Sequence, residues 1–205
     1  MKRGQAVTIR LPNEWEEETE VQAEYLGHGT FARCYRVENE VYSFVKYGDK
    51  ETDYSKQAVA LYADQNNPHI PKIQKAGSFN GDAGEIYRMP FYNRLTAKHK
   101  EAYKLYKILN THFVSLNNGD FSSVQALIPA SLYEALESIK FAVQNYGDNY
   151  LFEFQKCNLA VDDSGNLILL DIAFNYDAVR EIRRKSIARQ EAREELRQRI
   201  GIMPC

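Results

Sequence analysis

The chain has 205 residues, of which 44% are hydrophobic and 26% are charged, and its formal net charge is -2 at pH 7. This composition excludes an intrinsically disordered chain, and the length suits one domain of two lobes or two very small domains. The slightly negative charge argues against a general affinity for nucleic acid. No apolar run approaches the ~18 residues of a membrane span, and no secretory signal is expected at the start.

The first part of the chain has the alternating pattern of β-strands. Four segments rich in β-branched and aromatic residues, AVTIRL, EVQAEYL, ARCYRV and EVYSFVKY, are separated by turn residues up to about residue 48. They predict an antiparallel meander. A helix is expected within 50–68, with Thr52 or Asp53 as its N-cap. Strand character then returns in HIPKIQKAGSF and EIYRMPFY, around a turn at 80–84.

The second part is mostly helical in its spacing. Two segments, KHKEAYKLYKILNTHF and SLYEALESIKFAVQNYG, predict helices joined by a polar loop. The last segment, DAVREIRRKSIARQEAREELRQRI, predicts a charged helix that ends at Gly201 and Pro204. Its charge alternation is typical of a solvated helix, and an arm that binds a partner or RNA is the alternative.

A hairpin is expected between the second and third of these helices. In NLAVDDSGNLILLD the turn residues DDSGN separate two apolar runs. Asn158 opens this hairpin and Asp171 closes it, so an amide oxygen and a carboxylate should lie side by side. Both are the hard oxygen ligands that Mg²⁺ requires.

The cysteines and histidines give no independent metal signal. Cys34, Cys157 and Cys205 are far apart, odd in number and in no zinc-ligand spacing, and the four His are scattered as well. A metal held only by Cys and His is therefore not expected. The expected compartment is the cytoplasm.

Two glycines and a lysine are candidates for phosphate binding. Gly27 and Gly29 lie in EYLGHGTFARCYRV, where a strand, a glycine turn and a returning strand place backbone amides over a polyphosphate. Glycines serve equally well in an ordinary turn. Lys46 ends the strand EVYSFVK, where it either extends along an apolar surface or holds phosphate oxygens beneath the glycine turn.

Taken jointly, these features resemble the protein kinase fold over about residues 20–175. The kinase signature is G-x-G-x-x-G-x-V, V-A-I-K, H-R-D-x-x-x-x-N and D-F-G. The residues that match it are Gly27, Gly29, Phe31, Lys46, Asn158 and Asp171. The chain is also similar to the early serine/threonine kinases of podophages, which share an L-G-x-G-x-F loop and an Arg-rich helix after the metal-binding segment. That likeness suggests a phage protein in the host cytoplasm.

The resemblance implies an α+β, bilobal protein kinase-like fold. An antiparallel β-sheet N-lobe with one helix would take residues 1–92, and a reduced, mostly helical C-lobe with the catalytic loop and the metal-binding hairpin would take 93–175. Residues 176–205 would form the charged C-terminal helix.

The same resemblance implies ATP and Mg²⁺ as cofactors. The implied catalytic residues are Lys46, Glu153 and Asp171. The implied metal ligands are Asn158 and Asp171. The implied ATP-binding residues are Gly27, His28, Gly29, Thr30, Phe31, Lys46, Met89, Phe91 and Ala160.

Two departures from the kinase pattern concern catalysis. Glu153 stands where kinases keep their catalytic Asp, and its longer side chain displaces the carboxylate by about 1 Å, a shift that can cost of order 10²-fold in rate. The helix position expected to pair with Lys46 falls near Ala58, so the usual Lys-Glu ion pair is expected to be absent.

A third departure concerns the adenine pocket. Phe44 lies two residues before Lys46, so it is expected on the same face as the lysine and at the roof of this pocket. Ala160 on the opposing wall is smaller than usual. This exchange of sizes would either conserve the pocket volume or leave the pocket filled by Phe44.

Three functions follow as hypotheses. The first is a minimal, atypical protein kinase that transfers the γ-phosphoryl group of ATP to Ser or Thr of a protein of the host. The alternative is a pseudokinase that binds a partner as an inhibitor or scaffold. A small-molecule kinase of the aminoglycoside or choline type is third, but such enzymes carry a larger C-terminal lobe. The expected partner is a protein, with no membrane, and with nucleic acid only through the last helix.

Overall fold

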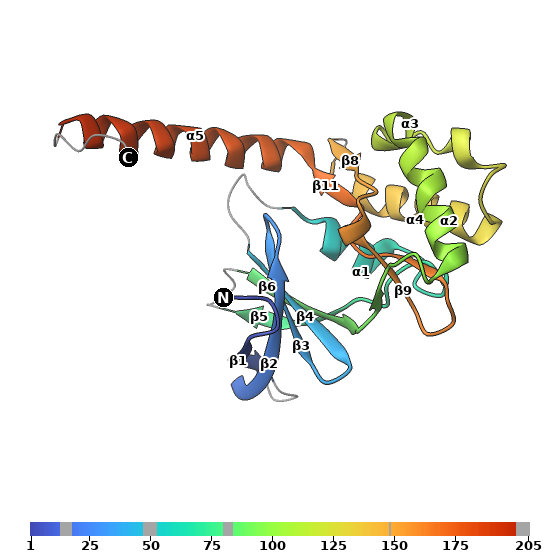
Figure 1. The fold of residues 1–205 in the computed structure, drawn as a ribbon, viewed down its shortest axis with the longest axis horizontal. Coiled ribbons are helices and arrows are strands. Elements are labelled where there is room, and N and C mark those ends of the chain that lie inside the picture. The colour runs from blue at the N-terminus through green and yellow to red at the C-terminus, as the bar shows by residue number, and fades with distance from the viewer. Residues whose placement is uncertain (13–17, 47–52, 80–83, 148, 200–205) are drawn as a thin grey trace.

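The computed structural model describes residues 1–12, 18–46, 53–79, 84–147 and 149–199, and it has an α+β fold (Figure 1). The strands are β1 (Ala6–Pro12), β2 (Glu18–His28), β3 (Ala32–Val37), β4 (Glu40–Lys46), β5 (Gln74–Phe79), β6 (Gly84–Pro90), β7 (Asn93–Arg94), β8 (Tyr150–Phe152), β9 (Leu159–Val161), β10 (Leu167–Leu169) and β11 (Ala173–Asn175). The α-helices are α1 (Ser55–Tyr62), α2 (Lys100–Thr111), α3 (Phe113–Asn117), α4 (Ala130–Gln144) and α5 (Tyr176–Arg199). Short 3-10 turns are η1 (Ser122–Val124) and η2 (Lys156–Asn158).

Six strands form one antiparallel sheet, in the order β1-β2-β3-β4-β6-β5. The first four strands are neighbours in chain order, so the predicted meander is confirmed. The sheet curls until its edge strands meet, since a Cβ added to Gly77 of β5 would lie 2.4 Å from Cγ of Pro12 at the end of β1. Glycine is required at this crossing because any side chain would collide with the proline ring. The turn expected at 80–84 falls largely outside the described residues.

Both faces of this sheet carry apolar side chains. One face, here called the Tyr35 face, packs a cluster of Ile9, Leu11, Ala23, Tyr25, Tyr35 and Ile86. The other, here called the Val45 face, packs Val45, Ile73, Tyr87 and Met89 against side chains of α1 and Leu170. Successive residues of a strand point to opposite faces, so β3, β4 and β6 contribute side chains to both clusters.

Helix α1 connects β4 to β5 and joins the sheet to the helical part. Its Ala58 is fully buried in the main core, while Val59 contacts both that core and the cluster on the Val45 face. The helix expected within 50–68 is therefore present but short, because it ends at Tyr62. Because α1 packs against the main core on one side and against the sheet on the other, its rotation about its own axis is fixed.

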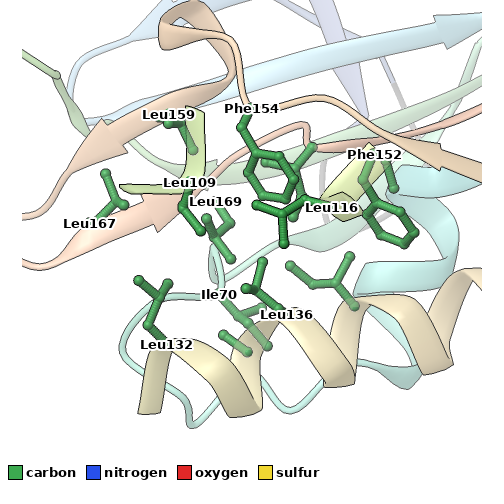
Figure 2. Close-up of a cluster of buried hydrophobic side chains, with 14 of the residues drawn as sticks. Ile70, Leu109, Leu116, Leu132, Leu136, Phe152, Phe154, Leu159, Leu167 and Leu169 are labelled. Atoms are coloured by element: carbon green, nitrogen blue, oxygen red, sulfur yellow. The ribbon is translucent and has the colours of Figure 1, made fainter. Parts of the chain in front are cut away.

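The main core lies between α4 and the hairpin of β9 and β10. Leu132 and Leu136 on α4 point toward Leu167 and Leu169 on the hairpin (Figure 2). These four side chains are at most 2% exposed. Because these side chains are buried against one another, the hairpin has little freedom to shift relative to α4.

We expect Leu136→Ala to lower the free energy of unfolding by about 2–5 kcal/mol, because it removes buried methylene groups and leaves a cavity. Leu136 is 0% exposed, whereas Phe141 on the same helix is 64% exposed. Phe141→Ala is the matched control, with an expected change within about 0.5 kcal/mol. Urea denaturation followed by circular dichroism measures both, and equal losses would contradict this placement of the core.

The predicted C-terminal helix is present as α5, while its expected end at Gly201 and Pro204 lies outside the described residues. Its first turn is anchored, with Ala178 only 2% exposed, and the backbone N–H of Ala178 donates to Oδ1 of Asn175 at 3.0 Å. Beyond this turn α5 extends away from α2, α3 and α4 (Figure 1). Within the described ranges, no helix combines the length and the apolar character that crossing a membrane requires.

Candidate functional site

The β9–β10 hairpin holds two of the predicted residues side by side. Leu159 pairs with Leu169 at the open end of the hairpin. Just beyond this pair, the backbone N–H groups of Leu170 and Asp171 both donate to the carbonyl oxygen of Asn158, at 3.0 and 3.3 Å. The expected return of Asp171 to the neighbourhood of Asn158 is therefore confirmed.

Glu153 reaches the same place through a second strand pair. Strand β8 pairs with β11, and the N–H of Glu153 donates to the carbonyl oxygen of Ile172 at 2.7 Å. The Glu153 carboxylate accepts hydrogen bonds from Nδ2 of Asn158 at 3.3 Å and from Nε2 of Gln155 at 2.5 Å. Backbone pairing, rather than a flexible loop, thus places a carboxylate next to the Asn158–Asp171 pair.

The cation that pairs with Asp171 comes from α1. Nζ of Lys56 lies 3.1 Å from Oδ2 of Asp171, and the side chains are 11% and 49% exposed. Burial lowers the pKa of Lys56, but the Asp171 carboxylate and further negative groups raise it more, so the net pKa lies above its ordinary value. Lys56 therefore stays charged at neutral pH, and its partner compensates the buried charge.

Lys46 is not brought to Asp171, so the predicted convergence of these two residues is wrong. Val41 and Val45 of β4 point toward α1, and the alternation of the strand places Lys46 on the opposite, Tyr35 face. There the exposed Lys46 and His28 line a cavity of about 600 Å³ that Asp171 does not line, although the turn at 29–32 lines both this cavity and the one beside Asp171.

Phe44 lies on the Tyr35 face as well. Its ring centroid is 5.4 Å from that of Tyr35 and 5.5 Å from that of Phe79. The expectation that Phe44 forms the roof of an adenine pocket is therefore wrong, although Phe44 and Lys46 do share a face as predicted. The residues of β4 that line the site are Val41 and Val45.

Two adjoining cavities surround the Lys56–Asp171 pair. One, here called the apolar cavity, has a volume of about 270 Å³, and the other, here called the polar cavity, has about 300 Å³. Both are lined by Cys34, Lys56, Asn158 and Asp171. These shared residues make the two cavities one continuous site, and the apolar cavity carries Arg3, Arg94 and Lys156 besides its apolar lining.

The predicted residues divide between these cavities. Those lining the apolar cavity are Met89, Phe91 and Ala160. Those lining the polar cavity are Gly29, Thr30, Phe31, Glu153, Asn158 and Asp171. Gly27 lines neither cavity; its φ of +149° lies at a register shift between β2 and β3, a conformation that favours glycine.

Several lining residues were missed by the sequence analysis. They include Leu26, Cys34, Val41, Asp53, Lys56 and Arg183, together with the cations Arg3, Arg94 and Lys156 of the apolar cavity. Lys56 carried one usable signal, because it lies three residues before Val59 and four before Ala60 on an expected helix. Residues at these spacings lie on the same face of a helix. On an apolar face, a lysine is buried only if it has a partner of opposite charge.

Asp53 adds a buried carboxyl group to the polar cavity. It is 6% exposed, and its Oδ1 accepts a hydrogen bond from the N–H of Ser55 at 3.0 Å, just before α1. Burial, followed by the charge of Asp171, raises the pKa of Asp53 from 3.8 to about 6. The site therefore contains one carboxyl group that titrates near neutral pH.

We expect Asp53→Asn to stabilise the chain at pH 7.5 by up to about 3 kcal/mol and to have little effect at pH 4. The folded chain keeps the Asp53 proton up to about pH 6, whereas the unfolded chain loses it near pH 3.8. The contribution of Asp53 to the free energy of unfolding is thus greatest below pH 3.8 and falls as the pH rises through 6. Urea denaturation of both proteins at the two pH values measures this, and an equal difference at both would contradict it.

The oxygen donors fit a magnesium ion that keeps waters and binds phosphates. Asn158 and Asp171 supply one amide and one carboxylate group, and Mg²⁺ usually takes one or two carboxylates alongside substrate phosphates. Across the described part of the chain, no three His, Cys, Asp or Glu side chains are grouped so as to hold a metal. This donor set suits a cation that arrives with a phosphorylated ligand.

No protein-family model matches the chain, and its comparison with curated proteins gives no match. The function is therefore argued from the geometry of the site.

Proposed function

We propose that this chain is a minimal protein kinase-like phosphotransferase that binds ATP with Mg²⁺ and transfers the γ-phosphoryl group to a Ser or Thr hydroxyl of a protein. The observation that carries the proposal is the buried Lys56 ammonium, 3.1 Å from the Asp171 carboxylate, where the apolar and polar cavities meet. A cation beside a carboxylate that would hold Mg²⁺, at such a junction, suits the phosphates of a nucleoside triphosphate.

The shape of the site supports a nucleotide. Ligand sites are concave and mostly apolar, with a few placed polar groups, and commonly measure roughly 300–1,000 Å³. The apolar cavity offers Leu26, Met89 and Ala160 to a base, and the polar cavity offers the turn at 29–31 to phosphates. A base and its phosphates would therefore occupy opposite ends of the same site.

The arrangement of the elements also supports a kinase-like N-lobe. The glycine turn joins β2 to β3, and helix α1 lies between β4 and β5. In protein kinases the phosphate-binding lysine is on a strand and pairs with a glutamate of the helix. In this proposal the helix supplies the lysine itself, as Lys56, and the late Asp171 is its partner.

The residues then have distinct roles. Lys56 neutralises phosphate charge and orients Asp171, while Asn158 and Asp171 would hold the magnesium ion. The ion would supply further charge neutralisation at the phosphates. Glu153 accepts the proton of the attacking hydroxyl as a general base.

Phosphate transfer by the wild-type chain tests this function. The full chain with [γ-³²P]ATP, Mg²⁺ and a mixture of host-cell proteins should label protein, and Mg·ATP at about 100 times its Kd should stabilise the fold by about 2.7 kcal/mol. Phosphoamino-acid analysis identifies the acceptor hydroxyl. The absence of both labelling and Mg-dependent stabilisation would refute the proposal.

A pseudokinase is the second candidate, and the hydrogen bonds of Glu153 favour it. Its carboxylate already accepts from both Asn158 and Gln155, so it is engaged within the site. In that case Mg·ATP would stabilise the fold without any labelling, and the chain would act by binding a partner.

A further inference from the structure

The polar cavity is closed on one side by the C-terminal helix. Val179 and Arg183, one turn apart on α5, line this cavity together with Gly29, Lys56 and Asp171. Residues four apart share a helical face, so this face of α5 is directed at the cavity. The helix begins at Tyr176, only five residues after Asp171, which keeps its first turns beside the site.

Arg183 differs from the neighbouring arginine in its contacts. Arg184 makes two hydrogen bonds to the carboxylate of Glu181, at 2.9 and 2.7 Å. Arg183 is exposed and makes no hydrogen bond or ion pair with any other residue that the structure describes. Its guanidinium is thus free to bind a ligand in the cavity.

A polyphosphate bound in the polar cavity would need a second cation besides Lys56. Three carboxyl groups, Asp53, Glu153 and Asp171, line it, and Lys56 is already paired with Asp171. A polyphosphate brought against this set meets repulsion that one paired lysine does not offset. Arg183 is the other cation among the described residues that line the polar cavity, whereas Arg3, Arg94 and Lys156 line the apolar cavity. A guanidinium fork suits phosphate oxygens.

We propose that Arg183 is a phosphate-binding residue, by which α5 completes the nucleotide site from the C-terminal end of the chain. This inference rests on the proposed function and deepens it. The C-terminal helix is then part of the binding site rather than a separate arm, and ligand binding depends on how α5 is seated.

Calorimetric titration of the full chain with Mg·ATP and with adenosine tests the role of Arg183. Arg183→Gln should weaken Mg·ATP binding roughly tenfold or more and leave adenosine binding unchanged, because only the charged hydrogen bonds to phosphate are lost. Arg184→Gln, with the same change of charge one residue away, should stay within about twofold of wild type. Arg183→Lys should be intermediate, since it keeps the charge but not the fork.

Other outcomes overturn the inference in distinguishable ways. Wild-type affinity for Mg·ATP in Arg183→Gln, or an equal loss of adenosine binding, refutes the role of Arg183 while the proposed function stands. Failure of the wild-type chain to bind Mg·ATP removes the proposed function, and this inference with it.

Discussion

Replacing Lys56 by methionine is expected to reduce phosphate transfer roughly 10²-fold or more and to weaken Mg·ATP binding, because charged hydrogen bonds to phosphate each contribute about 1.5–3 kcal/mol. The loss has a second cause. Without the Lys56 ammonium, the Asp171 carboxylate loses its partner 3.1 Å away and is no longer held in place. Labelling from [γ-³²P]ATP and calorimetric titration with Mg·ATP measure the two effects.

Lys46→Met is the matched control, since it removes the same group from a lysine on the Tyr35 face of the sheet. We expect it to retain transfer and binding close to the wild type. Thermal unfolding of both variants shows whether either has lost its fold. If Lys46→Met were inactive and Lys56→Met active, the assignment of the phosphate-binding lysine to α1 would be wrong.

Glu153→Gln is expected to lower the rate of phosphate transfer by about 10²–10⁴-fold, the usual contribution of a general base, while Mg·ATP affinity changes little. Glutamine has nearly the same shape and can still accept through its amide oxygen from Asn158, which lies 3.3 Å away. The substitution therefore removes the basic group and largely preserves the geometry. Single-turnover labelling separates the chemical step from nucleotide binding.

Glu153→Asp is the companion variant, because it restores the carboxylate on a shorter side chain. It should recover part of the activity lost in the glutamine variant. Equal transfer rates in the wild type and in Glu153→Gln would show that Glu153 is not the base. Undetectable transfer in all three proteins, with Mg·ATP binding intact, would favour the pseudokinase.

The position of α1 links these predictions to the fold. Ala58 packs into the main core and Val59 contacts both the core and the sheet, so the rotation of the helix is fixed on two sides. Lys56 is consequently held at the edge of both cavities, at low side-chain exposure. Changes that loosen the packing of α1 should therefore weaken the Lys56–Asp171 pair.

Local sequence patterns determined the order of the elements and one half of the candidate site. Apolar alternation predicted the meander, and turn residues between two apolar runs predicted the hairpin that joins Asn158 to Asp171. These features depend on residues close in sequence or on paired strands, so a period of two and turn chemistry are enough to indicate them.

Only the tertiary structure decided which side chains enter the site. Strand β4 reads EVYSFVK, with apolar residues on both faces, so the sequence gives no sign of which face meets α1. Alternate residues of β4 point to opposite faces of the sheet. Val45 therefore points toward α1 and the site, whereas Phe44 and Lys46 point to the Tyr35 face. Lys56 and Arg183 enter the site from helices whose rotation is set by packing against distant residues. The helical spacing of Lys56 to Val59 and Ala60 indicates a buried face, but it does not say which residues meet that face.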